Sequence, residues 1–197
     1  GAAGIGASVG ISVARNFIGW TPDGNADENQ VRAYLQDTSV DADGDLALTA
    51  VASQTIGAII IAGAVAVGAG GIGVAGAGSG VFAENKIGVD VAAFIDGDGD
   101  AAGSVGISAD SVALMARDTS LINALAGAVA VSVGAGGVGA ALSLGVSLAR
   151  NTITSQVDAY IRNADGVAAD PADRGVNAEG AGGITVSAAS DATVSST

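Results

Sequence analysis

Two short acidic loops are the segments of this sequence whose residue types could do chemistry. In each loop, three aspartates alternate with glycine or alanine. Carboxylates spaced in this way can direct several oxygens at one centre, which a hard cation with about six to eight oxygen ligands requires. The sequence therefore predicts candidate calcium ligands at Asp41, Asp43, Asp45, Asp96, Asp98 and Asp100.

The calcium pattern is incomplete, and a plain turn is the structural alternative. The loops match the first half of an EF-hand loop but lack the glutamate that closes it. Aspartate and glycine are also the usual residues of solvated turns. We expect both loops to occupy the same place in two copies of a repeat, with a weaker version at 163–166. Calcium is the only cofactor that the sequence suggests.

The sequence gives little support for catalytic or cofactor-binding sites of other kinds. The chain has no cysteine and no histidine, which removes disulfides, thiolate metal sites and histidine-based nucleophilic catalysis. The segment GAGGIG at 68–73 is glycine-rich, but a dinucleotide fingerprint must lead into a helix, and strand-like alternation follows here. No catalytic residue is predicted, and we expect the protein not to be an enzyme.

The net charge limits the partners. Twenty acidic and seven basic residues give a formal charge of −13. Because phosphate backbones repel such a chain, we expect no nucleic-acid partner.

Alternation with period 2 is the main structural signal, and it is clearest at 127–151. Large apolar residues occupy every second position on both sides of the glycine-rich segment 134–137. This period indicates a strand with one buried face, and the glycines indicate a chain reversal. We expect the large apolar residues to form the buried face.

The same pattern recurs along the chain with a constant shift, which aligns Asn85 with Asn151 and Val65 with Val131. We divide the chain into a partial unit 1–56, a second unit 57–122 and a third unit 123–197 with a longer acidic loop. An asparagine at the same point of each unit predicts a stacked amide ladder or a left-handed turn position. An aromatic residue at another equivalent point predicts packing at the end of a layer rather than a platform for a ligand. The two sets are Asn16, Asn85, Asn151 and Tyr34, Phe94, Tyr160.

A membrane-spanning helix is the strongest competing interpretation, because the run 57–83 is uncharged and long enough. That run contains nine glycines, each costing a helix interior about 1 kcal/mol relative to alanine. Its large residues also keep period 2, which a helix in lipid does not require. We therefore predict that the chain is not membrane-spanning.

The predicted fold class is all-β, as a repetitive β-solenoid or β-helix-like rod built from units of about 66 residues. Coils of about 22 residues, three to a unit, would suit a solenoid rising ~4.8 Å per coil. The alternative is a set of antiparallel hairpins, one across each glycine-rich reversal, stacked in a sheet or sandwich.

The unit GAVAV, GAGG, GVSLARN, VDAYI and ITVSA resembles the repeats of giant bacterial exoproteins and surface adhesins, of the filamentous-haemagglutinin-like or calcium-dependent type. The resemblance implies an extracellular or cell-surface bacterial location and a structural segment that associates with itself, head to tail or laterally, in a filament. Adhesion, cell aggregation or sheath formation would follow. The alternative is a module that binds a cell-surface glycan or protein through variable loops, around Trp20 and Pro171.

Overall fold

The computed structural model describes residues 2–99, 106–165 and 175–197, and every regular element in these ranges is a strand. The all-β prediction is confirmed. Long strands dominate, because alternating apolar and small residues favour an extended chain. The strands are β1 (Ala3–Ile18), β2 (Asn29–Gln36), β3 (Val40–Asp41), β4 (Leu46–Ala52), β5 (Thr55–Ala69), β6 (Ile72–Asp96), β7 (Ile107–Asp118), β8 (Leu121–Ala135), β9 (Val138–Arg162), β10 (Val176–Ser190) and β11 (Thr193–Ser196).

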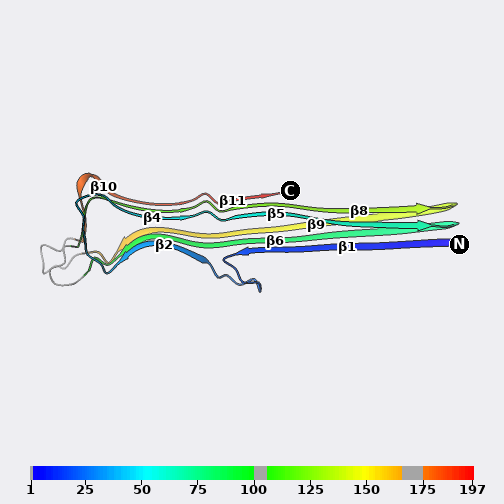
Figure 1. The fold of residues 1–197 in the computed structure, drawn as a ribbon, viewed down its shortest axis with the longest axis horizontal. Helices are drawn as coiled ribbons and strands as arrows, with labels where there is room; N and C mark the ends of the chain where they lie inside the picture. Colours follow the sequence, from blue (N-terminus) through cyan, green and yellow to red (C-terminus); the bar gives the residue numbers. More distant parts are fainter. Residues whose placement is uncertain (1, 100–105, 166–174) are drawn as a thin grey trace.

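These strands form two layers (Figure 1). One layer is a single sheet in which β6 is central, with β9 on one side and β1 followed by β2 on the other. The second layer contains two sheets. In the first, β7 lies between β10 and the pair β3 and β4, and in the second, β8 lies between β5 and β11.

Pairing between named strands is parallel throughout the described ranges, and it joins residues one repeat apart. Ile72 of β6 pairs with Val138 of β9, and Thr55 of β5 pairs with Leu121 of β8. Both pairs have the same separation as Asn85 and Asn151, which is one repeat unit. The chain runs out along one layer, reverses at residues 70–71 and returns along the other. Corresponding residues of successive repeats therefore lie side by side.

Two sequence-based expectations are wrong at this level. The strands on either side of a reversal, β5 and β6, belong to different sheets, so they do not form the antiparallel hairpin of the alternative prediction. The shorter coils, three to a unit, are also excluded, because hydrogen-bonded neighbours are separated by a whole repeat unit. Period 2 reveals strands but not their partners, since pairing depends on contacts distant in sequence.

The core is widest near the loops, where its side chains are largest. There the buried residues include Ile95, Ile107 and Leu114, contributed by both layers. Farther along, isoleucine alternates with alanine, as in Ile60 and Ala62. The layers are correspondingly farther apart at the loop end, which we call the base (Figure 1).

The opposite end is a thin two-layer arm, made of residues 3–14, 58–83 and 124–149, which we call the apolar arm. Toward its tip the buried positions hold only small residues, such as Ala64, Ala66, Ala75 and Ala77, whereas Ile60 and Val81 are buried where the arm meets the base. At the tip they become glycines, and a Cβ on Gly73 would collide with the carbonyl oxygens of neighbouring strands. Small inner side chains thus allow the two layers to approach closely.

The large aliphatic residues of the arm point outward, contrary to our expectation that they form the buried face. Ile5 is 83% exposed, and Ile59 and Leu142 are each 75% exposed. The alternation correctly predicts strands, but it does not say which face is inside. Here the two layers are joined through their alanine and glycine faces, and both outer faces of the arm are covered with valine, isoleucine and leucine.

The narrowing distance between the two layers toward the tip predicts opposite effects of two glycine substitutions in β6. Gly73→Ala should destabilise the fold by about 1–3 kcal/mol, because the added methyl meets backbone of β5 and β8 in the opposite layer. Gly78→Ala, its control, faces open space and should be neutral or stabilise by about 0.4–1 kcal/mol. Chemical denaturation followed by circular dichroism measures both, and equal effects would contradict the close approach of the layers.

Candidate functional site

The two acidic loops do not lie at equivalent places, which corrects the sequence-based alignment. Asp41 ends β3 and pairs with Ser108, whereas Asp96 ends β6 and pairs with Gln36. Gln36 pairs with Asp96, and the next residue pair along the chain is Val40 with Ile107. The loop from Asp96 to Ile107 in the second unit is therefore longer than the loop from Gln36 to Val40 in the first. As a result, the aspartates of the first unit begin at the end of β3, whereas those of the second unit begin at the end of β6.

In the second loop, the first two aspartates have structural contacts. The Asp96 carboxylate accepts hydrogen bonds from Arg162 at 2.6 Å and from Asn163 at 2.7 Å. These bonds, that from Arg162 first, lower the pKa of Asp96 below its ordinary range. Asp98 is fully buried, and it is flanked by Gly97 and Gly99 with φ of +86° and +80°. Such backbone angles favour glycine, so this segment is a tight turn.

The remaining candidate ligands are dispersed. Asp41 and Asp43 are exposed, and Asp45 accepts a hydrogen bond from the Ser111 hydroxyl at 2.6 Å. Asp100 lies outside the described residues, as do Gly166 and Pro171. Within the described ranges, no group of three or more potential metal-binding side chains is found. Calcium binding by these loops stays a prediction.

The predicted asparagine ladder is confirmed, and it lies between the layers. The Asn16 amide donates to the side-chain oxygen of Asn85 at 2.7 Å, and the Asn85 amide donates to Asn151 at the same distance. Asn85 is fully buried. The Asn85 amide both donates and accepts along the stack, so this buried polar side chain is hydrogen-bonded within the protein and needs no water.

Sequence analysis missed a second buried polar group, centred on Asp118. Its carboxylate accepts from the Ser120 hydroxyl at 2.6 Å and from the Ser155 hydroxyl at 2.5 Å. The Ser120 hydroxyl also lies 2.8 Å from the side-chain amide of Gln54. The group joins the bend between β7 and β8 to β9 in the other layer. The only sequence signal was the alignment of Gln54 with Ser120, one repeat unit apart.

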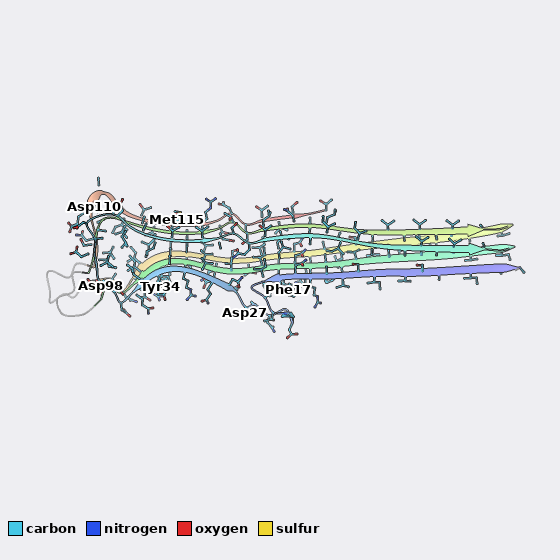
Figure 2. All side chains as sticks on the ribbon, viewed as in Figure 1. Phe17, Asp27, Tyr34, Asp98, Asp110 and Met115 are labelled. Carbon is cyan, nitrogen blue, oxygen red and sulfur yellow. The ribbon has the colours of Figure 1, made fainter. Side chains whose placement is uncertain are left out.

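The aromatic set, for which the sequence predicted packing at the end of a layer, forms a stack of rings on the outer face of the β2, β6 and β9 region. The ring of Phe94 lies 5.1 Å from that of Tyr34 and 5.0 Å from that of Tyr160, within 10° of parallel. Figure 2 shows Tyr34 on this outer side. Arg162 lies over the Tyr160 ring at 5.0 Å. Both faces of Phe94 are covered and Arg162 covers Tyr160, so Tyr34, at 52% exposure, is the most exposed ring of the stack.

A shallow depression of about 380 Å³ surrounds this stack. Ion pairs line it, with Arg32 2.7 Å from Asp90 and Arg162 2.6 Å from Asp96. These charged groups already neutralise one another, which leaves little unsatisfied binding capacity for a charged ligand.

A mixed aromatic and charged group marks the boundary between base and arm. Lys86 lies 4.7 Å from the Trp20 ring centroid and 5.4 Å from that of Phe17, and it forms an ion pair with Glu84 at 3.1 Å. Arg15 contacts the same Glu84 at 3.4 Å. Figure 2 shows Phe17 on the outer side, beside the loop that carries Asp27.

Comparisons with protein-family models, curated proteins and solved structures find no match to this chain. In the described part of the chain, no helix is long and apolar enough to cross a membrane.

The pKa shift of Asp96 predicts an acid-dependent contribution to stability. Its pKa is lowered in the folded state, so the contribution is present above about pH 4 and is lost as the pH falls further. In Asp96→Asn, the melting temperature should therefore depend less on pH below about pH 4 than in the unmodified chain. Thermal unfolding across pH tests this, with exposed Asp23→Asn as the control; identical profiles for the two variants would contradict it.

Calcium binding by the acidic loops predicts a rise in melting temperature. A ligand that binds only the folded state stabilises it, by about 2.7 kcal/mol at 100 times its dissociation constant. Magnesium at equal concentration controls for ionic strength, and Asp41→Asn together with Asp43→Asn should reduce the effect. A melting temperature that chelation leaves unchanged would remove the proposed site.

Proposed function

We propose that this chain is a structural repeat segment of an extracellular bacterial fibre or giant surface protein, and that it associates end to end with copies of itself. In this proposal the units 1–56, 57–122 and 123–197 are successive coils of a β-solenoid rod, one whole repeat unit to each coil. The observation that carries it is the parallel pairing of strands one repeat apart.

Open sheet edges support end-to-end association. In the described sheets, β1 and β5 lie at one edge, while β9, β10 and β11 lie at the other. An unpaired edge is a template for another parallel strand. Because the repeat places the same residues at both edges, the last coil of one molecule is complementary to the first coil of the next.

The side-chain ladders support the same association. Asn16 and Asn151 end the amide column, each with one neighbour where Asn85 has two. Stacking Asn151 of one molecule on Asn16 of the next would continue the column unchanged. The composition fits a scaffold as well, since cysteine and histidine are absent and the polar groups described above bond mainly to one another.

Adhesion, cell aggregation or sheath formation would follow from such rods at the cell surface. The alternative function, glycan binding through variable loops, has less support, because the stacked aromatic rings lie on strands β2, β6 and β9 rather than on the variable loops. The half-buried Trp20 also packs against Lys86, as expected of a residue that covers a loop.

Electron cryo-microscopy of the purified chain tests the proposal. We expect fibres in which strands cross the axis with a spacing of ~4.8 Å. Asn151→Ala should lower the association constant about fivefold, because about 1 kcal/mol of hydrogen bonding is lost at each junction. It also removes one internal bond, that from Asn85, and leaves the bond between Asn16 and Asn85 in place.

The matched control is Asn85→Ala, which removes two internal hydrogen bonds at a fully buried position. It should destabilise the fold itself by about 1–3 kcal/mol. Discrete monomers at all concentrations, for the unmodified chain, would overturn the proposed self-association.

A further inference from the structure

The apolar arm exposes aliphatic side chains on both of its outer faces. On the outer face of the β1, β6 and β9 sheet, Ile11 and Leu144 are 76% and 65% exposed. On the opposite face, Val65 and Val131 are 66% and 47% exposed. The turns at the tip are uncharged. A surface this extensively apolar marks an interaction with another apolar phase.

The apolar surface ends at one level on both faces. The first charged residues of the strands on one face are Arg15, Glu84 and Arg150, which pair across β1, β6 and β9. On the other face, the first polar residue that points outward, counted from the tip, is Asn123. Gly145 of β9 lies opposite Ala128 of β8. Because β8 and β9 run in opposite directions, Arg150, five residues farther along β9, lies opposite residue 123. A common boundary on two opposite faces indicates a planar interface between water and an apolar layer.

The residues at this boundary are those that favour a lipid–water interface. Phe17 and Trp20 lie beside Lys86, and Arg15 follows directly on the aliphatic row. Tryptophan is enriched at this depth, and long cationic side chains reach from it into water.

The height of the aliphatic rows matches the hydrocarbon layer. Val138 to Leu148 covers ten residue steps and Ile59 to Val67 covers eight, which correspond to roughly 26–33 Å at ~3.3 Å per residue. The hydrocarbon core of a bilayer is ~30 Å thick.

We propose that the apolar arm inserts, tip first, into the hydrocarbon of a lipid bilayer, with the base and its loops left in water. This proposal departs from the sequence-based prediction that the chain is not membrane-spanning. The grounds of that prediction, glycine content and period 2, argue against a helix in the membrane and not against strands. Both outer faces and the tip would contact acyl chains, and the boundary residues would lie among the headgroups.

Backbone hydrogen bonding allows this insertion. Polar backbone groups in lipid must be paired within the protein. Pairing between repeats provides this on both sides of β6 and on one side each of β5 and β8. It continues through the tip, where Gly70 N–H donates to Ala135 and Val138 N–H donates to Gly71. The outermost strands need a further coil, so insertion rests on the proposed end-to-end stacking at the two edges.

The central strand adds a groove for acyl chains. Three outward positions of β6, between Val74 and Phe82, are Gly76, Gly78 and Gly80, where an added side chain would meet no atom within 4 Å. Larger residues of β1 and β9, such as Ile11 and Leu144, stand on either side. The two rows are about 10 Å apart, two strand spacings, so one acyl chain can lie along the glycines.

A second copy of the chain is the other apolar partner to consider. Stacking of arms would cover one face of each molecule and leave the second face exposed in any closed dimer. It would also give no reason for cationic and aromatic residues at the boundary. Lipid covers both faces and the tip at once, and it is the occupant that these observations favour.

Flotation with phosphatidylcholine vesicles tests the insertion, with Val131→Lys and Met115→Lys as matched variants. Both residues lie on the outer face of the same layer, at 47% and 46% exposure, but Val131 is in the arm and Met115 at the base. The unmodified chain and Met115→Lys should float with the vesicles. Val131→Lys should partition about 100-fold less strongly, because it places a charge in hydrocarbon.

Trp20, the single tryptophan, reports the depth. Its fluorescence should be quenched more by lipids brominated near the glycerol than by those brominated at the chain ends. Circular dichroism verifies the folding of Val131→Lys, and Leu144→Lys on the opposite face should show the same loss of binding.

Two results would overturn the inference. One is equal flotation of Val131→Lys and Met115→Lys, which would place lipid binding on another surface. The other is fibres that stack laterally and do not float, which would show that copies of the chain cover the arm. In that case the end-to-end association of the proposed function would still stand, because microscopy without lipid measures it separately.

Discussion

Parallel hydrogen bonding between strands one repeat apart is the constraint on which the rest of this structure depends. It places each residue beside its own counterpart in the next repeat, so a side chain must be compatible with itself. An amide can donate and accept at once, as Asn85 does between its two neighbours. Like charges at the same position of neighbouring strands would repel one another. Glu84 accordingly lies between Arg15 and Arg150.

Side-chain size then determines the distance between the layers. Isoleucine and leucine fill the base, alanine fills the arm, and glycine at the tip leaves backbone against backbone. Since the inner face of the arm is reserved for small residues, its large aliphatic residues have only the outer face to occupy. The thin core and the apolar exterior are therefore one feature. Both the rod that we propose and its insertion into lipid build on it.

Much of the architecture could be predicted from the sequence, and the candidate site less so. The constant shift between repeats correctly pairs Asn85 with Asn151 and Phe94 with Tyr160, because a repeat that stacks in parallel preserves its own alignment. The acidic loops could not be aligned in this way. Insertions in the connections change the offset between Asp41 and Asp96, and sequence spacing records chain length rather than position in space.

The sequence by itself determined that the chain is made of strands, that it repeats, and where it reverses, because these features depend on local periodicity and on glycine. Only the tertiary structure decided which face is inside. Alternation is symmetric between the two faces of a strand, and the choice depends on what the opposite layer presents. In the arm, glycine and alanine of β6 face glycine and alanine of β5, and this contact directs Ile59 and its neighbours outward.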